Sequence, residues 1–174
     1  MNSVALFDQV CQKASKHTTY GYSTSFSLGI RSLDKRFHAP IHAIYGFVRF
    51  ADEIVDTFHG YDKQDLLRRF REDTHRSIAE GISLNPILHS FQRVVNTFHI
   101  EAELYDTFLD SMAMDLRDTA HDQQSYETYI LGSAEVVGLM CLRVFCEGDH
   151  ALYAKLKPAA MKLGAAFQKV NFLR

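Results

Sequence analysis

Asp52 and Asp56 are the first residues of this chain whose types and spacing could do chemistry, because two carboxylates lie one helical turn apart in RFADEIVD. On a helix of about 100° per residue, both fall on or beside a stripe of apolar side chains. That stripe comprises Ile41, Ile44, Tyr45, Val48 and Val55. The pattern predicts that both carboxylates face inward, where their mutual repulsion and their desolvation, on the order of several kcal/mol, need a compensating charge.

Two interpretations of these acids stay open. Arg49 lies one turn before Asp52 and Glu53, so the acids and the arginine could form an internal ion-pair cluster that braces a helical bundle. Alternatively, Asp52 and Asp56 bind Mg²⁺, a hard cation that prefers carboxylate oxygens and that in turn holds a substrate phosphate. The stretch alone favours neither.

Other polar residues follow apolar stripes in the same way. In ELYDTFLDSMAMDL, Asp115 ends a stripe, where it could be a helix cap or a buried salt-bridge partner of Arg49 or Arg174. In MKLGAAFQKVNFLR, Gln168 and Asn171 share one side with apolar residues, and taken alone such amides usually satisfy backbone groups. Taken together with the aspartates, these residues predict a helical cavity with polar groups above apolar walls.

The elements that must position these residues are predicted to be helices, because apolar residues recur at three- and four-residue steps and no run alternates with period two. The expected helices span 3–17, 22–31, 35–58, 63–80, 86–98, 101–117, 123–147 and 151–174. Asp34 and Asp62 suit N-caps, and Gly60 and Gly81 follow expected helix ends. Pro40 falls early in its helix, which must start later or bend there. Helix 63–80 reads as a surface helix and helix 123–147 as a central one.

Composition bounds the kind of protein. A chain of 174 residues with 47% hydrophobic and 23% charged residues is expected to form one soluble domain, 1–174, and its net charge of −2 gives no basic surface for nucleic acid. Three cysteines without metal-ligand spacing indicate reduced thiols in a cytoplasmic protein. The sequence shows neither a signal peptide nor a clean membrane span, and contact with a membrane surface stays open.

Four segments, in order, resemble the squalene and phytoene synthase family of head-to-head prenyltransferases. They are YSTSFSLGIRSL, AIYGFVRFADEIVD, SMAMDLRD with YILGSAEVVGLM, and KLGAAFQKVNFLR. The second resembles the first aspartate-rich motif of the family, DxxxD preceded by an arginine, and GSAEVVGLMCLRVF is most similar to bacterial phytoene synthases. The resemblance implies the N-terminal part of an isoprenoid-synthase-type helical bundle around a central cavity.

The resemblance also implies a reaction: Mg²⁺-dependent condensation of two geranylgeranyl diphosphates to phytoene through a cyclopropylcarbinyl diphosphate. Asp52 and Asp56 would hold Mg²⁺ and Arg49 would grip phosphate oxygens. Ser23 and Ser25 would face the diphosphate and Phe26 the prenyl chain. The cavity-wall and further substrate positions that the resemblance implies are Tyr45, Tyr129, Val137, Gly138 and Leu163, together with Asp115, Gln168, Asn171 and Arg174.

The chain departs from the family pattern at three places. Glu135 stands where a small residue is expected, and AHDQQSY replaces an Arg-Tyr pair after Asp115. The chain also stops at Arg174, one residue before the first aspartate of the family's second acidic motif. We therefore expect a truncated chain that makes no phytoene by itself. The alternatives are squalene or dehydrosqualene synthesis from farnesyl diphosphate, a non-catalytic relative that binds lipid or a partner, and an ordinary helical bundle.

Overall fold

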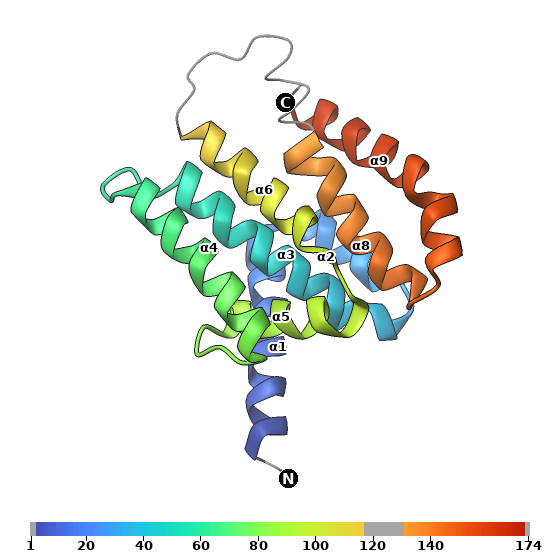
Figure 1. Ribbon diagram of the computed structural model, residues 1–174, viewed down its shortest axis with the longest axis horizontal. Helices are drawn as coiled ribbons and strands as arrows, with labels where there is room; N and C mark the ends of the chain where they lie inside the picture. Colours follow the sequence, from blue (N-terminus) through green and yellow to red (C-terminus); the bar gives the residue numbers. More distant parts are fainter. Residues whose placement is uncertain (1–2, 117–130, 173–174) are drawn as a thin grey trace.

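The computed structural model describes residues 3–116 and 131–172, with the side chains of 131, 132 and 169–172 excepted. The helices are α1 Ser3–Tyr22, α2 Thr24–Arg31, α3 Lys35–Asp56, α4 Lys63–Glu80, α5 Pro86–Phe98, α6 Ala102–Asp115, a π-helical turn η1 Leu131–Glu135, α8 Val136–Cys146 and α9 His150–Phe172 (Figure 1). These ranges contain no strand, which confirms the all-α prediction. Within them, no helix is both long and apolar enough to cross a membrane.

Local capping explains why most helix ends lie where the sequence predicts them. The Asp34 carboxylate accepts a hydrogen bond from the Arg36 amide at 3.1 Å, and Asp62 accepts one from the Asp65 amide at 3.0 Å. Gly81 ends α4 with a φ of 71°, a left-handed conformation that glycine adopts without strain. Pro40 lies inside α3, which nevertheless begins at Lys35 as predicted.

α1 runs further than the predicted 3–17. The hydroxyls of Thr18 and Thr19 donate to the carbonyls of Ala14 and Ser15, both at 3.0 Å, so these residues join the helix instead of ending it. The chain leaves helical geometry only at Ser23, with φ −148° and ψ 107°. The end of α1 and the start of α2 therefore meet at one residue.

An aromatic cluster fixes α3 in the core. The Phe47 ring of α3 stacks on Phe91 of α5 with centroids 3.9 Å apart and planes 4° apart, and it lies 5.6 Å from both Phe70 of α4 and Phe108 of α6. Phe47, Phe91 and Phe108 are almost fully buried. Because four helices meet at one side chain, α3 cannot shift without disturbing each of them.

The described part of the predicted helix 123–147 is central, as expected, although it is not one regular helix. Residues 123–130 lie outside the described residues, and the described part begins with the π-helical turn before α8 continues. α8 packs against α3, α6 and α9, and η1 packs against α6 and α9 (Figure 1). α9 thus reaches the rest of the bundle mainly through these two elements.

Two glycines let α9 approach η1 and α8 closely. A Cβ on Gly164 would lie 2.7 Å from the Ala134 carbonyl oxygen, closer than atoms can approach, and one on Gly138 would lie 3.3 Å from the Ala160 carbonyl oxygen. The contact at Gly164 is the tighter of the two. Glycine at these two positions therefore lets the backbone of α9 lie close to the backbones of η1 and α8.

We expect Gly164→Ala to destabilise the protein by about 1–3 kcal/mol, because its methyl group would meet backbone atoms that cannot rotate away. Gly29→Ala in α2 is the matched control, since a Cβ there meets nothing within 4 Å. It should leave stability unchanged or raise it by up to about 1 kcal/mol through helix propensity. Urea unfolding midpoints measure both changes. Equal stability of the two variants would show that α9 can move away from η1 at no cost.

A buried histidine joins α1 to α3. His42 is 3% exposed, and its Nδ1 lies 2.9 Å from the Thr19 hydroxyl oxygen. That hydroxyl already donates its only proton to the Ser15 carbonyl, so Nδ1 of His42 must carry the proton and donate. Burial, then Lys16 and His38 as nearby positive groups, lowers the pKa of His42 from 6.5 to about 4. The fold therefore needs the neutral imidazole.

This lowered pKa gives a pH dependence of stability. Between pH 6.5 and about pH 4, His42 is protonated in the unfolded chain but neutral in the folded chain. The contribution of His42 to the free energy of unfolding is therefore complete above pH 6.5 and is lost as the pH falls toward 4. His42→Gln should flatten this acid limb by about 3 kcal/mol, whereas His17→Gln on the exposed side of α1 should not. Unfolding midpoints between pH 8 and pH 4 make the comparison, and an unchanged acid limb in His42→Gln would contradict it.

Candidate active site

The C-terminal end of α3 carries an excess of negative charge. Asp52, Glu53 and Asp56 lie within its last five residues, and its last turn has no basic residue. The helix macrodipole adds a partial negative charge at the same end. One positive group comes from the next helix, where the Lys63 ammonium donates to the Val55 carbonyl at 2.6 Å. This helix end thus concentrates charge that its own sequence does not balance.

Asp52 is the residue most affected. Burial raises the pKa of its carboxyl from 3.8 to about 7; the Arg49 guanidinium opposes the rise, and the Asp56 and Asp115 carboxylates add to it. Asp115 is the last residue of α6 and is half-buried. The structure therefore brings together the three aspartates that the sequence singled out.

The two members of the DxxxD pair do not share one environment. Asp52 is half-buried, as predicted, but Asp56 is exposed. The prediction that both carboxylates face inward is wrong for Asp56, because α3 ends at that residue and leaves its side chain at the rim of the packed bundle. The pair therefore spans the boundary between the interior and the solvent.

Arg49 is held by contacts from two elements. Its Nη2 pairs with the Glu53 carboxylate one turn later in α3, and its guanidinium carbon lies 4.4 Å from the centroid of the Tyr22 ring at the end of α1. The ion pair that the sequence suggested thus exists, with Glu53 as its direct partner. In the described part of the chain, the buried Nε of Arg49 has no hydrogen-bond partner.

Tyr45 connects this cluster to α2. Its ring lies 5.0 Å from that of Phe26, whose amide donates to the capping hydroxyl of Ser23 at 3.1 Å. Burial raises the pKa of Tyr45; Arg49 opposes the rise, Asp52 adds to it, and a hydrogen bond with Ser23 lowers it. Ser25 is exposed. Ser23, Phe26 and Tyr45 therefore join the acidic cluster.

The predicted wall residues lie in different settings. Val137 is half-buried against the core, Gly138 faces the backbone of α9, Leu163 is 59% exposed, and Gln168 is half-buried. The structure does not describe the side chains of three further predicted residues: Tyr129, Asn171 and Arg174. Two residues that the sequence did not single out, Tyr22 and Lys63, do reach the site, through contacts that form only in the folded chain.

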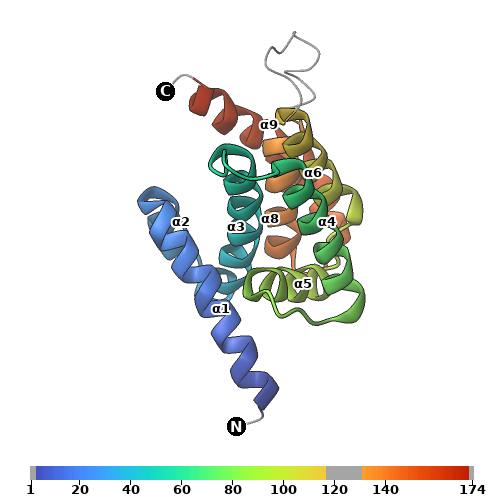
Figure 2. The same ribbon diagram turned by 90° about the vertical axis from the view of Figure 1, so that its left-hand side faces the viewer.

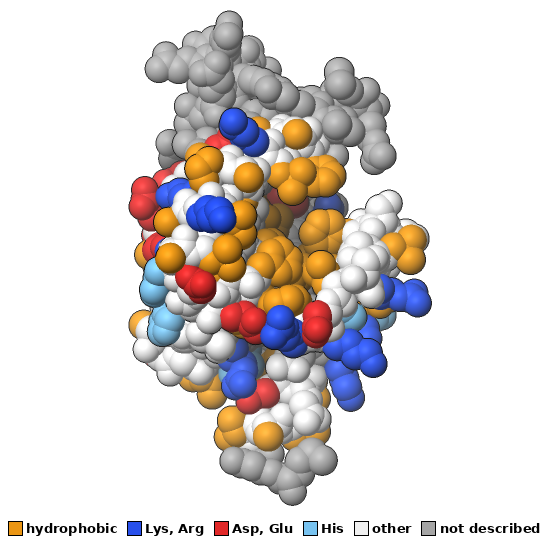
Figure 3. All heavy atoms as spheres, turned by 90° about the vertical axis from the view of Figure 1, so that its right-hand side faces the viewer, with side chains coloured by type: hydrophobic (Ala, Val, Ile, Leu, Met, Phe, Trp, Pro, Cys, Tyr) orange, Lys and Arg blue, Asp and Glu red, His pale blue; other side chains and the backbone are white. Residues whose placement is uncertain are grey.

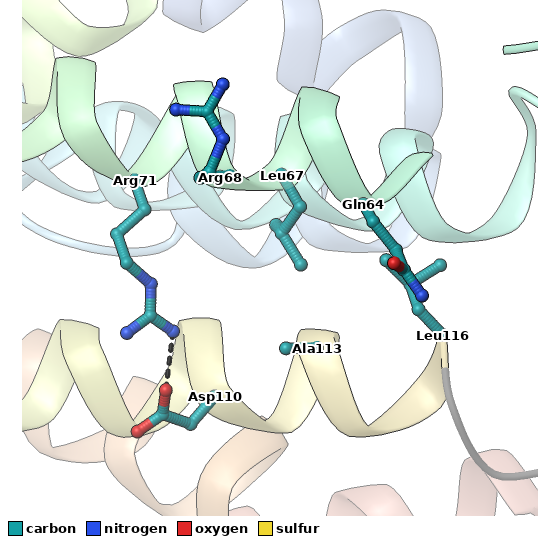
Figure 4. A pocket seen from close by; sticks show the side chains of 7 residues that line it. All are labelled: Gln64, Leu67, Arg68, Arg71, Asp110, Ala113 and Leu116. Carbon is teal, nitrogen blue, oxygen red and sulfur yellow. Dashed lines mark hydrogen bonds and ion pairs between the residues drawn. The ribbon is translucent and has the colours of Figure 1, made fainter. Parts of the chain in front are cut away.

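Hydrophobic side chains gather in a hollow on one face of the molecule, between the arm formed by α2 and the rest of the bundle (Figure 3). Two cavities are described besides this hollow. One, of about 280 Å³, lies between α4 and α6, where Arg71 and Asp110 pair at 2.5 Å across its edge (Figure 4). The other, of about 210 Å³, lies among α1, α3 and α5. Polar and charged side chains line parts of both cavities, whereas the hollow in Figure 3 is lined mainly by hydrophobic side chains.

The donor set at the end of α3 fits Mg²⁺ in part. Carboxylate oxygens are its preferred protein ligands, and the surplus of negative charge around Asp52 favours a cation. Among the described residues, however, no group of three or more His, Cys, Asp or Glu could hold an ion. The residues therefore suit an ion that takes a few ligands from Asp52 and Asp56 and the rest from water or a phosphate.

The charge at Asp52 predicts that Asp52→Asn is more stable than the wild type at pH 8 without metal. The folded chain holds the Asp52 proton up to about pH 7, whereas an unstrained carboxyl loses it near pH 3.8, so ionisation destabilises the fold as the pH rises between these values. A shift of this size corresponds to about 4 kcal/mol. Because Asp52 is only half-buried and solvent screens its charge, we expect a gain on the order of 2 kcal/mol at pH 8 that shrinks toward pH 4. Asp73→Asn, in a surface pair with Arg76, should show no gain. A less stable Asp52→Asn would identify Asp52 as a structural ion-pair partner.

Solved structures share this fold. A dehydrosqualene synthase determined in complex with ligand matches with a TM-score of 0.80 at 23% identity, covering 95% of this chain and 56% of that one. The squalene synthase HpnC from Alicyclobacillus acidocaldarius matches with a TM-score of 0.82 at 19% identity, covering 94% and 60%. Both are isoprenoid-synthase-type helical folds, which confirms the predicted fold class.

Sequence comparison gives the family. A presqualene diphosphate synthase from Zymomonas mobilis is 31% identical over 157 residues, which are 87% of this chain and 52% of that protein. A phytoene synthase from Rhodobacter capsulatus is 29% identical over 172 residues, 95% and 47% of the two chains. This chain thus spans about half the length of these relatives. The sequence pattern of squalene/phytoene synthases matches residues 19–174, and the chain belongs to that family.

Proposed function

We propose that this chain provides a diphosphate-binding wall of an enzyme that joins two prenyl diphosphates head to head. The observation that carries the proposal is Asp52, a half-buried carboxylate among like charges with Arg49 beside it. Such a group is costly in a purely structural role, whereas it suits a site that receives a cation and an anion together. Membership of the squalene/phytoene synthase family supports the same conclusion.

Each residue then has a role in binding. Bound Mg²⁺ would be held by Asp52 and Asp56 and would neutralise charge on the departing diphosphate. Arg49 binds phosphate oxygens, and Ser23 contributes a hydroxyl at the start of α2. The rings of Phe26 and Tyr45 lie beside the prenyl chain, where aromatic faces stabilise a nearby carbocation. The apolar hollow keeps water from that cation.

The substrate that we propose is geranylgeranyl diphosphate. Two molecules lose two diphosphates and two protons and give phytoene, with the cyclopropylcarbinyl diphosphate between the two steps and no reductant needed. Because phytoene is a hydrocarbon, we also propose that the enzyme releases it at a membrane surface. A second candidate is presqualene diphosphate formation from two farnesyl diphosphates, which the 31% identical relative from Zymomonas mobilis favours.

Product analysis with each substrate separates the candidates. The full-length protein, with Mg²⁺, receives geranylgeranyl diphosphate or farnesyl diphosphate in separate reactions and then the two in competition. Preferential conversion of the C20 substrate to phytoene supports the first candidate. Preference for the C15 substrate with presqualene diphosphate as product supports the second, and no turnover of either would leave a binding protein on the same fold.

Asp52→Asn and Asp56→Asn in the full-length protein should each lower turnover by about 10²–10⁴-fold, because each removes charge that stabilises the departing diphosphate. Both variants should remain folded, since neither loses an apolar contact. Circular dichroism and thermal melts check the fold, and Asp73→Asn serves as the surface control. Near-normal turnover in either site variant would mean that these aspartates brace the bundle instead.

A further inference from the structure

The guanidinium of Arg49 lies between groups that come from different parts of the chain. Tyr22 is the last residue of α1, and its ring faces the guanidinium carbon at 4.4 Å. Glu53 pairs with Nη2 from within α3. α1 and α2 both pack on α3 and lie along one side of it (Figure 2). The position of α1 therefore determines which side chain covers the face of the Arg49 guanidinium.

These contacts restrict the guanidinium without saturating it. An arginine side chain has about 2 kcal/mol of rotamer entropy to lose on binding, and a group that is already fixed loses less of it. Meanwhile the buried Nε has no partner in the described residues, and an unsatisfied buried donor costs about 1–3 kcal/mol. The Arg49 guanidinium is thus restricted by Tyr22 and Glu53, yet the side chain keeps 27% of its surface exposed, where a ligand can reach it.

The Tyr22 contact has no evident role in the core. Tyr22 is 51% exposed and is not one of the buried core residues, and its ring lies over the Arg49 guanidinium. A ring face attracts a cation and leaves the edge donors of the guanidinium free for oxygen atoms. A carboxylate in the same place would occupy those donors. A ring is therefore suited to hold an arginine that must bind something else.

We propose that Tyr22 is a positioning residue that holds the Arg49 guanidinium for a diphosphate oxygen. The inference rests on the proposed role of Arg49 as a diphosphate ligand. It deepens that role because it assigns the orientation of Arg49 to a residue outside the aspartate-rich segment. The break between α1 and α2 at Ser23 then serves two ends, since it places Tyr22 over Arg49 and the Ser23 hydroxyl by Tyr45.

Binding of inorganic pyrophosphate to the 174-residue chain tests this role, measured by calorimetry with the same saturating Mg²⁺ in every sample, because the carboxylates around Asp52 would otherwise repel the anion. Tyr22→Leu should weaken binding about 5-fold, whereas Tyr22→Phe should stay within about twofold of the wild type, because only the ring is needed. Tyr20→Leu is the matched control: Tyr20 is on the same helix, 43% exposed, and its ring lies under Lys16 at 5.5 Å instead. It should bind pyrophosphate as the wild type does.

Arg49→Leu distinguishes the role of Arg49 as a diphosphate ligand from the role of Tyr22 in positioning it. If it weakens pyrophosphate binding by a measurable factor, Tyr22→Leu should weaken binding no further in that background, as expected for residues that act as a pair. Loss of binding in Arg49→Leu with unchanged binding in Tyr22→Leu would overturn the positioning role alone. Unchanged binding in Arg49→Leu, or none by the wild type, would overturn the role of Arg49 as a diphosphate ligand, and the positioning role with it. A Tyr22→Phe variant as weak as Tyr22→Leu would also overturn the proposal, since the hydroxyl and not the ring would then matter.

Discussion

The surplus of negative charge at the C-terminal end of α3 is the constraint on which the rest of the site depends. Four carboxylates, those of Asp52, Glu53, Asp56 and Asp115, lie on the last turns of α3 and α6. The positive groups described nearby are Arg49, which pairs with Glu53, and Lys63, which binds a backbone carbonyl. Like charges held this close stay in place only if the scaffold forces them to, and they are relieved only by cations.

The scaffold supplies that force through rigid packing one to two turns away. Phe47 lies five residues before Asp52 on the same helix, and three other helices pack around its ring. His42, one turn further back, ties α3 to α1 through Thr19. Because α1 is fixed in this way, Tyr22 and Ser23 at its end arrive beside Arg49 and Tyr45. Core packing and site geometry therefore depend on the same face of α3.

Much of the fold was predictable from the sequence because its signals are local. Asp34, Asp62 and Gly81 mark helix ends by hydrogen bonds and backbone angles within a few residues. The exceptions are non-local or ambiguous. Thr18 and Thr19 disfavour a helix by propensity but remain in α1, where their hydroxyls bond to carbonyls of the preceding turn and Thr19 also meets His42. The π-helical turn lies against Gly164, and that contact from a distant helix is invisible in its own five residues.

In the candidate site, too, local sequence patterns predicted some residues correctly, whereas contacts made only on folding could not be predicted. Helical spacing correctly predicted that Asp52 faces inward, because five apolar residues define the stripe on which it lies. The same prediction failed for Asp56, because α3 ends at this residue and periodicity does not show where a helix leaves the packed core. Tyr22 and Lys63 carried no signal in the sequence, since their importance lies in what folding places next to them. The family resemblance supplied Ser23 and Phe26, which no spacing argument would have chosen.

The titration of the Asp52 carboxyl by carbon-13 NMR, in the 174-residue chain with and without Mg²⁺, tests this account most directly. The account predicts a pKa of about 7 in the metal-free chain, and a fall of that pKa when Mg²⁺ is added, because a bound cation stabilises the ionised carboxylate. A carboxyl that titrates at its ordinary value of 3.8 and does not respond to Mg²⁺ would contradict it. The end of α3 would then be an ordinary charged helix terminus.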